Sequence, residues 1–140
     1  MKIFNNKYLI PVWTILRVWL GFQWLIPGLE KIKDPTWVGS EAGVAITGFL
    51  KGALAKSTGD HPAVQWRYAR FVESVALPNV KIFTYLVPYG EVLVGISLIL
   101  GAFTIAGLLG GAFMNLNYLL AGTTSTNPIL YTAAIILIAA

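Results

Sequence analysis

The sequence predicts an all-α integral membrane protein, a four-transmembrane-helix bundle with an interfacial helical insertion between helices 1 and 2. Hydrophobic residues make up 56% of the 140 residues and charged residues only 11%, whereas a soluble domain is typically about 25% charged. The mean hydropathy is +0.71. Arg17 is the only charged residue between positions 8 and 29, and Glu91 is the only one between 82 and 140. Because one crossing takes about 20 apolar residues, each stretch is long enough to span a bilayer.

The predicted organisation is a single transmembrane domain over residues 1–140. Its basic start and first apolar run resemble a secretory signal, but the run exceeds the roughly 7–15 residues of a signal core. The elements are a first span at about 8–29, the insertion at about 35–79, and further spans at about 80–100, at about 103–121 and from 128. The last of these covers about 20 Å, against a hydrocarbon core of about 30 Å. We therefore expect the natural chain to continue beyond residue 140.

The insertion contains two amphipathic stretches. Apolar residues recur at helical spacing within 42–54 and within 64–75, with charged residues at the edges of both. This pattern is typical of helices that lie flat on a membrane surface. His61 falls in the turn between the two stretches and is expected to be a solvated loop residue. A polar loop at 122–127 is expected to precede the last span.

The residue types present exclude several classes of chemistry. The chain has no cysteine and one histidine, so it has no thiolate nucleophile, no zinc–thiolate site and no iron–sulfur cluster of its own. No metal site is expected. The net charge of +4 arises mostly outside the apolar stretches and without a basic run. It indicates lysines that fix the ends of the spans, or contact with anionic lipid headgroups, and not nucleic-acid binding. Redox chemistry would therefore need a bound organic cofactor or a partner that carries the redox centre.

Arg17 and Glu91 are the two ionisable residues inside predicted spans. Such residues are costly in a bilayer and mark a functional site by default. Counted along their predicted helices, both lie about 14 Å from the same membrane face. We therefore expect an Arg17–Glu91 ion pair, which would either lock the first two spans together or serve a ligand or a proton.

Small, polar and aromatic residues form one stripe on each of the first three spans at the spacing of a single helix face. The stripes are expected to face one another, while the other faces meet lipid. Their members are Arg17, Gly21, Trp24, Gly28 and Lys31; Thr84, Pro88, Glu91 and Gly95; and Gly107, Gly111, Asn115 and Tyr118. Two roles stay open for the asparagines, helix association or substrate binding, and two for the tryptophans, interfacial anchoring or cofactor stacking.

These stripes also carry a family resemblance. Arg17 with Leu20-Gly21, Gly90-Glu91 before Gly95, and Asn115-Leu116-Asn117-Tyr118 before Asn127-Pro128 resemble the DoxX family of small bacterial membrane proteins. The insertion, with Gly48-Phe49-Leu50-Lys51-Gly52-Ala53-Leu54, His61-Pro62 and Leu77-Pro78-Asn79, is similar to the DoxD-like branch. The resemblance covers almost the whole chain.

The resemblance implies a four-helix bundle in the bacterial cytoplasmic membrane and a membrane subunit of a quinone-linked oxidoreductase. The DoxD-like branch implies that electrons pass from thiosulfate to a membrane quinone, giving tetrathionate, with a second oxidoreductase subunit as partner. We expect the N-terminus inside and the insertion outside; a homo-oligomer is compatible with the sequence. The expected catalytic residues are Arg17 and Glu91, the quinone-binding residues Trp24, Asn115 and Asn117, and the thiosulfate-binding residues Lys31 and Lys33.

Two other functions remain open from the sequence. A non-catalytic membrane scaffold or assembly factor for a partner redox enzyme would use the aromatic and basic residues of the insertion, from Trp66 to Phe71, as its docking surface. A small transporter would use the intramembrane charges, but no inverted repeat is visible in the chain to support it.

Overall fold

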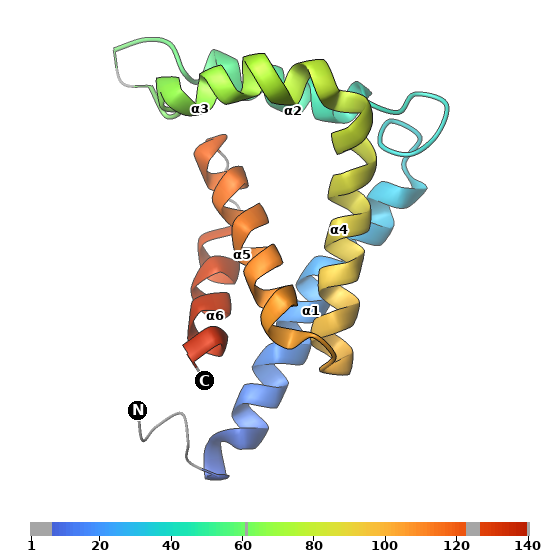
Figure 1. Cartoon of the computed structure of the whole chain (residues 1–140), viewed down its shortest axis with the longest axis vertical. Coiled ribbons are helices and arrows are strands. Elements are labelled where there is room, and N and C mark those ends of the chain that lie inside the picture. The colour runs from blue at the N-terminus through green and yellow to red at the C-terminus, as the bar shows by residue number, and fades with distance from the viewer. Residues whose placement is uncertain (1–6, 61, 123–126, 140) are drawn as a thin grey trace.

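A computed structural model of the chain describes residues 7–60, 62–122 and 127–139. Within these ranges the fold is all-helical and contains no strand (Figure 1). The helices are α1 (Ile10–Lys33), α2 (Val44–Ala55), α3 (Trp66–Phe71), α4 (Val80–Leu100), α5 (Thr104–Leu120) and α6 (Asn127–Ala139). Short turns precede α1 (Lys7–Leu9) and join α3 to α4 (Val72–Ala76 and Leu77–Asn79). His61 and most of the predicted polar loop, residues 123–126, lie outside the described residues.

Two layers make up the molecule. Helices α1, α4, α5 and α6 run along its long axis, while α2 and α3 lie across one end (Figure 1). Two helical segments, Lys7–Lys33 and Trp66–Leu100, are long and apolar enough to cross a membrane by length and composition. Helices α5 and α6 are apolar but shorter.

The surface of this fold is unusually apolar, and a few polar side chains lie within its mainly apolar interior. Large apolar side chains such as Ile15, Leu93 and Phe113 are about two-thirds exposed or more, whereas Glu91 and Asn115 are buried at 2% and 0% exposure. A water-exposed surface of this kind would be unfavourable, while a lipid-facing one is not. The predicted stripes are indeed the buried faces, since Gly21, Trp24 and Gly28, then Thr84, Pro88, Glu91 and Gly95, then Gly107, Gly111 and Asn115 are all buried.

Glycines set the register between α1 and α4. A Cβ atom on Gly95 would lie 2.7 Å from the carbonyl oxygen of Gly21, and one on Gly28 would lie 2.9 Å from the backbone nitrogen of Val92. The two backbones therefore touch directly, as small residues allow in membrane helix pairs. This contact decides which side chains of the two helices meet.

The insertion packs on itself and on the end of the bundle. Ile46 and Leu50 of α2 form an apolar cluster with Val72 and Ala76, just beyond α3. The hydroxyl group of Tyr68 on α3 donates to the backbone and side-chain oxygens of Asn117 on α5, at 3.1 and 3.2 Å. The insertion is thus fixed over the end of the bundle at which α1 finishes (Figure 1).

Candidate functional site: a buried carboxylate at the end of the bundle

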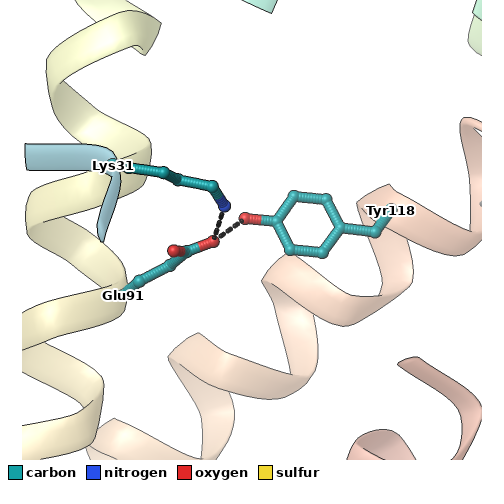
Figure 2. A network of polar contacts seen from close by, with 3 residues as sticks. All are labelled: Lys31, Glu91 and Tyr118. Carbon is teal, nitrogen blue, oxygen red and sulfur yellow. Dashed lines mark hydrogen bonds and ion pairs between the residues drawn. The ribbon is translucent and has the colours of Figure 1, made fainter. Parts of the chain in front are cut away.

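The most polar contact inside the bundle joins three helices. The Lys31 ammonium group at the end of α1 lies 2.6 Å from Oε1 of Glu91 on α4. The Tyr118 hydroxyl group on α5 donates to the same oxygen at 2.6 Å (Figure 2). Glu91 is 2% exposed, whereas the Lys31 side chain is 26% exposed. The carboxylate is therefore buried with a cation that reaches toward the surface.

Part of this site lacks hydrogen-bond partners. Oε2 of Glu91 and both amide atoms of Asn115 are buried without a partner within the described chain. Gly90 on α4 faces Met114 on α5, with 3.7 Å from a Cβ at position 90 to the methionine sulfur, so Glu91 and Asn115 lie within about one helical turn of the same level. An unpaired buried polar atom costs about 1–3 kcal/mol, so these three atoms are the hydrogen-bonding capacity that the described chain leaves unused. We call Lys31, Glu91, Asn115 and Tyr118 the Glu91 cluster.

Aromatic rings surround the Glu91 cluster. The Trp24 ring, 3% exposed, lies 6.4 Å from the Tyr118 ring, and Phe49 of α2 meets the Tyr118 ring edge-on at 6.2 Å. The Lys31 ammonium group also lies 5.2 Å from the centre of the Trp37 ring, a favourable cation–π distance. These contacts hold the lysine and the tyrosine in place around the carboxylate.

Thr84 fixes the first part of the insertion above the cluster. Its buried hydroxyl group donates to the Trp37 carbonyl oxygen at 2.5 Å and accepts from the Gly43 N–H at 3.1 Å. Just before Trp37 in the chain, the Thr36 hydroxyl group and backbone N–H both donate to the Asp34 carboxylate. These two hydrogen bonds lower the pKa of the Asp34 carboxyl group below its usual value. The chain after α1 is thereby held in one conformation, which places Trp37 beside Lys31.

Replacing Thr84 by valine should loosen the insertion. The nearly isosteric change leaves the Trp37 carbonyl oxygen without the Thr84 hydroxyl group, at a cost of about 2 kcal/mol. The Gly43 N–H loses one of its two acceptors and keeps the Thr36 carbonyl oxygen at 3.1 Å. We expect faster tryptic cleavage after Lys51 and Lys56 in the reconstituted protein. Thr14→Val is the control, because Thr14 is exposed and bonds only within its own helix; equal cleavage rates in both variants would contradict this role.

The expected Arg17–Glu91 ion pair is wrong. A Cβ on Gly101 would collide with the Arg17 guanidinium group, so Arg17 lies at the turn after α4. Gly101 is ten residues from Glu91, or about 15 Å along the helix. The prediction assumed that both helices begin or end at the same membrane face. The glycine contacts instead offset the two helices along their axes, so that the N-terminal part of α1 extends past the C-terminal end of α4 (Figure 1).

The other predicted site residues divide into two groups. Trp24, Asn115 and Lys31 lie on the same side of the bundle interior as Glu91, and Lys31, which was expected to bind thiosulfate, forms an ion pair with the carboxylate. Lys33 is exposed. The Asn117 side chain accepts from Tyr68 of the insertion and donates to the Phe113 carbonyl oxygen one turn earlier in α5. Neither joins the Glu91 cluster.

Sequence reasoning missed Tyr118 and Trp37 as site residues. Tyr118 belongs to the predicted stripe of α5, so its position three residues after Asn115 was a usable signal. Trp37 lies in an irregular segment whose path no periodicity reveals. In the part of the chain that the structure describes, one groove between α1 and α6 and another between α1, α5 and α6 are lined by no residue of the Glu91 cluster.

A family model described as DoxX matches residues 12–124, a range that contains the whole Glu91 cluster. No curated protein matches the chain, and no solved structure does.

Proposed function

The chain belongs to the DoxX family, whose members are generally membrane proteins, and from this premise we propose that it is a four-span membrane subunit of a quinone-linked oxidoreductase in the bacterial cytoplasmic membrane. The four spans would be α1, α4, α5 and α6. The exposed apolar side chains of all four support this arrangement.

The observation that carries the proposal is that Oε2 of Glu91 and the amide of Asn115 are both buried without a partner within the described chain, on facing helices and at about the same level. A quinone accepts two electrons and two protons and becomes a quinol, whose hydroxyl groups donate hydrogen bonds. The Asn115 amide can donate to a quinone carbonyl oxygen, and Oε2 of Glu91 can accept from a quinol hydroxyl group. The residues present therefore fit the head group of a quinone.

Three members of the Glu91 cluster, and Trp24 next to it, have further roles in this proposal. Glu91 holds and releases the proton, as a positioned carboxylate does in general acid–base catalysis. Lys31, which is partly exposed, neutralises the carboxylate and connects it to the surface. Tyr118 orients Oε1, which leaves Oε2 for the ligand, and Trp24 packs beside the ring.

We propose thiosulfate as the electron donor because the insertion resembles that of the DoxD-like branch. Two thiosulfate ions would join through a new S–S bond to give tetrathionate and two electrons, which reduce the quinone. Because the chain has no cysteine, this oxidation would take place with the partner subunit. Lys33, exposed at the end of α1, would attract the dianion.

The test is thiosulfate-dependent reduction of a soluble quinone analogue by the protein reconstituted with its natural partner. Glu91→Gln should lower kcat by about 100-fold or more, the usual contribution of a general acid–base group. The matched control is Glu73→Gln, an exposed carboxyl in the insertion. Full turnover in Glu91→Gln would remove the carboxylate from the reaction.

A non-catalytic scaffold is the second candidate, and the exposed surface of α3 favours it. Trp66 is 62% exposed and is flanked by Arg67 and Arg70, whose guanidinium groups lie 5.4 and 5.9 Å from its ring. Exposed Trp and Arg are typical of protein interfaces. Purification in mild detergent distinguishes the scaffold from the oxidoreductase subunit. A scaffold would co-purify with a partner protein, would lose that partner in the Trp66→Ala variant, and would not reduce the quinone analogue.

A further inference from the structure

The end of the bundle opposite the Glu91 cluster contains a cation in an apolar groove. The groove has a volume of about 290 Å³ and is formed by α1, α5 and the end of α6. We call it the Arg17 groove; its lining residues are Ile10, Trp13, Thr14, Arg17, Thr104, Leu108 and Leu137. Most of its wall is therefore apolar, with one full positive charge.

Arg17 has no acidic partner within the described chain. The ion pair found there joins Lys31 to Glu91, and no acidic residue occurs in positions 1–29 or 92–140 of the sequence. Lys7 adds a second cation at the same end of α1. Among the side chains that the structure describes at this end of the bundle, the positive charges therefore have no acidic counterpart.

The fold leaves room for the guanidinium group. Gly101 has a φ angle of +74°, which a glycine adopts without strain, and any side chain there would occupy the space of Arg17. The turn from α4 to α5 is also where two apolar helices end. In a bilayer such a turn lies near the level of the lipid phosphates, and a guanidinium group at this depth reaches the headgroup layer.

We propose that the Arg17 groove binds an anionic glycerophospholipid. Arg17 donates two parallel N–H bonds to the phosphate, for which the planar guanidinium group is well matched. Ile10, Leu108 and Leu137 contact the first methylene groups of an acyl chain. The uncompensated charge at this end selects a lipid with net negative charge over a zwitterionic one. This site is independent of the proposed quinone chemistry, since Arg17 and Glu91 lie far apart.

Native mass spectrometry of the detergent-solubilised protein tests the proposal. Phosphatidylglycerol and phosphatidylcholine are titrated separately, and the bound fractions are compared. We expect the wild type to bind phosphatidylglycerol about fivefold more tightly than phosphatidylcholine. This is the increase in affinity that one basic residue near an anionic lipid surface supplies. Arg17→Gln should remove this preference, Arg17→Lys should keep part of it, and Arg67→Gln, on exposed α3, should leave it intact.

Three outcomes would overturn the proposal. They are equal binding of the two lipids by wild type, which needs no variant to fold; an unchanged preference in Arg17→Gln; and displacement of phosphatidylglycerol by millimolar inorganic phosphate, which would identify a site for free anions.

Discussion

Replacing Lys31 by methionine is expected to destabilise the protein by about 3–5 kcal/mol, because it leaves the buried Glu91 carboxylate without its counter-ion. The double variant Lys31→Met/Glu91→Gln should recover most of this loss. Glutamine carries no charge and keeps an oxygen that can accept from the Tyr118 hydroxyl group. The free energy of unfolding in mixed micelles, measured for the wild type, both single variants and the double variant, gives the coupling between the two residues.

The neighbouring Lys33 provides the control for this cycle. Lys33 is exposed at the end of the same helix, so Lys33→Met should change stability by less than about 0.5 kcal/mol. Additive effects of Lys31→Met and Glu91→Gln would show that the two side chains do not interact, and the Glu91 cluster would lose its basis.

Replacing Gly95 by leucine should separate α1 from α4. A Cβ at this position would lie 2.7 Å from the backbone of α1 at Gly21 and at Leu25, so the helices must move apart. Overpacking of this kind costs about 3 kcal/mol or more when backbone atoms block the new side chain. We expect a large loss of thermal stability in micelles and, because Lys31 and Glu91 sit on these two helices, a loss of their contact.

Gly48 supplies a control, because its replacement should change stability in the opposite direction. It lies inside α2, and a Cβ there would meet no atom within 4 Å. Gly48→Ala should therefore raise stability by about 0.5–1 kcal/mol through helix propensity alone. If Gly95→Leu were tolerated as well as Gly48→Ala, the backbone contact between α1 and α4 would be excluded.

Periodicity in the sequence predicted the interior faces of three helices. Glycine and polar residues recur at helical spacing on α1, α4 and α5, and the buried positions, such as Trp24, Glu91 and Asn115, fall on those stripes. This worked because lipid-facing positions tolerate only apolar residues, so the remaining face is visible as a pattern.

The pairing of charges could not be predicted in the same way. A stripe gives the rotational position of a residue on its helix but not the offset between two helices along their axes. That offset is set by backbone contacts, here the contact of Gly21 with Gly95. It places Lys31 next to Glu91 and places Arg17 next to the loop between α4 and α5. The long lysine side chain can also reach a carboxylate at a different membrane depth, so an ion pair with Glu91 does not require that the two residues lie at the same depth.

The insertion was predictable only in part. Hydrophobic spacing predicted helices within 42–54 and 64–75, and the structure has α2 and α3 there. The position of Trp37 beside Lys31 depends instead on hydrogen bonds of Thr84 and Asp34 with residues of an irregular segment. Such contacts have no periodic signature in a sequence.

The most direct test of the account measures the distance between Lys31 and Glu91 in a bilayer. Solid-state NMR of protein carrying ¹⁵N in lysine side chains and ¹³C in glutamate carboxyl groups reports nitrogen–carbon contacts in native lipid. We predict one close contact, consistent with the 2.6 Å separation of Lys31 Nζ and Glu91 Oε1, that disappears in Lys31→Met and persists in Arg17→Gln. No such contact, or one that survives Lys31→Met, would contradict the account.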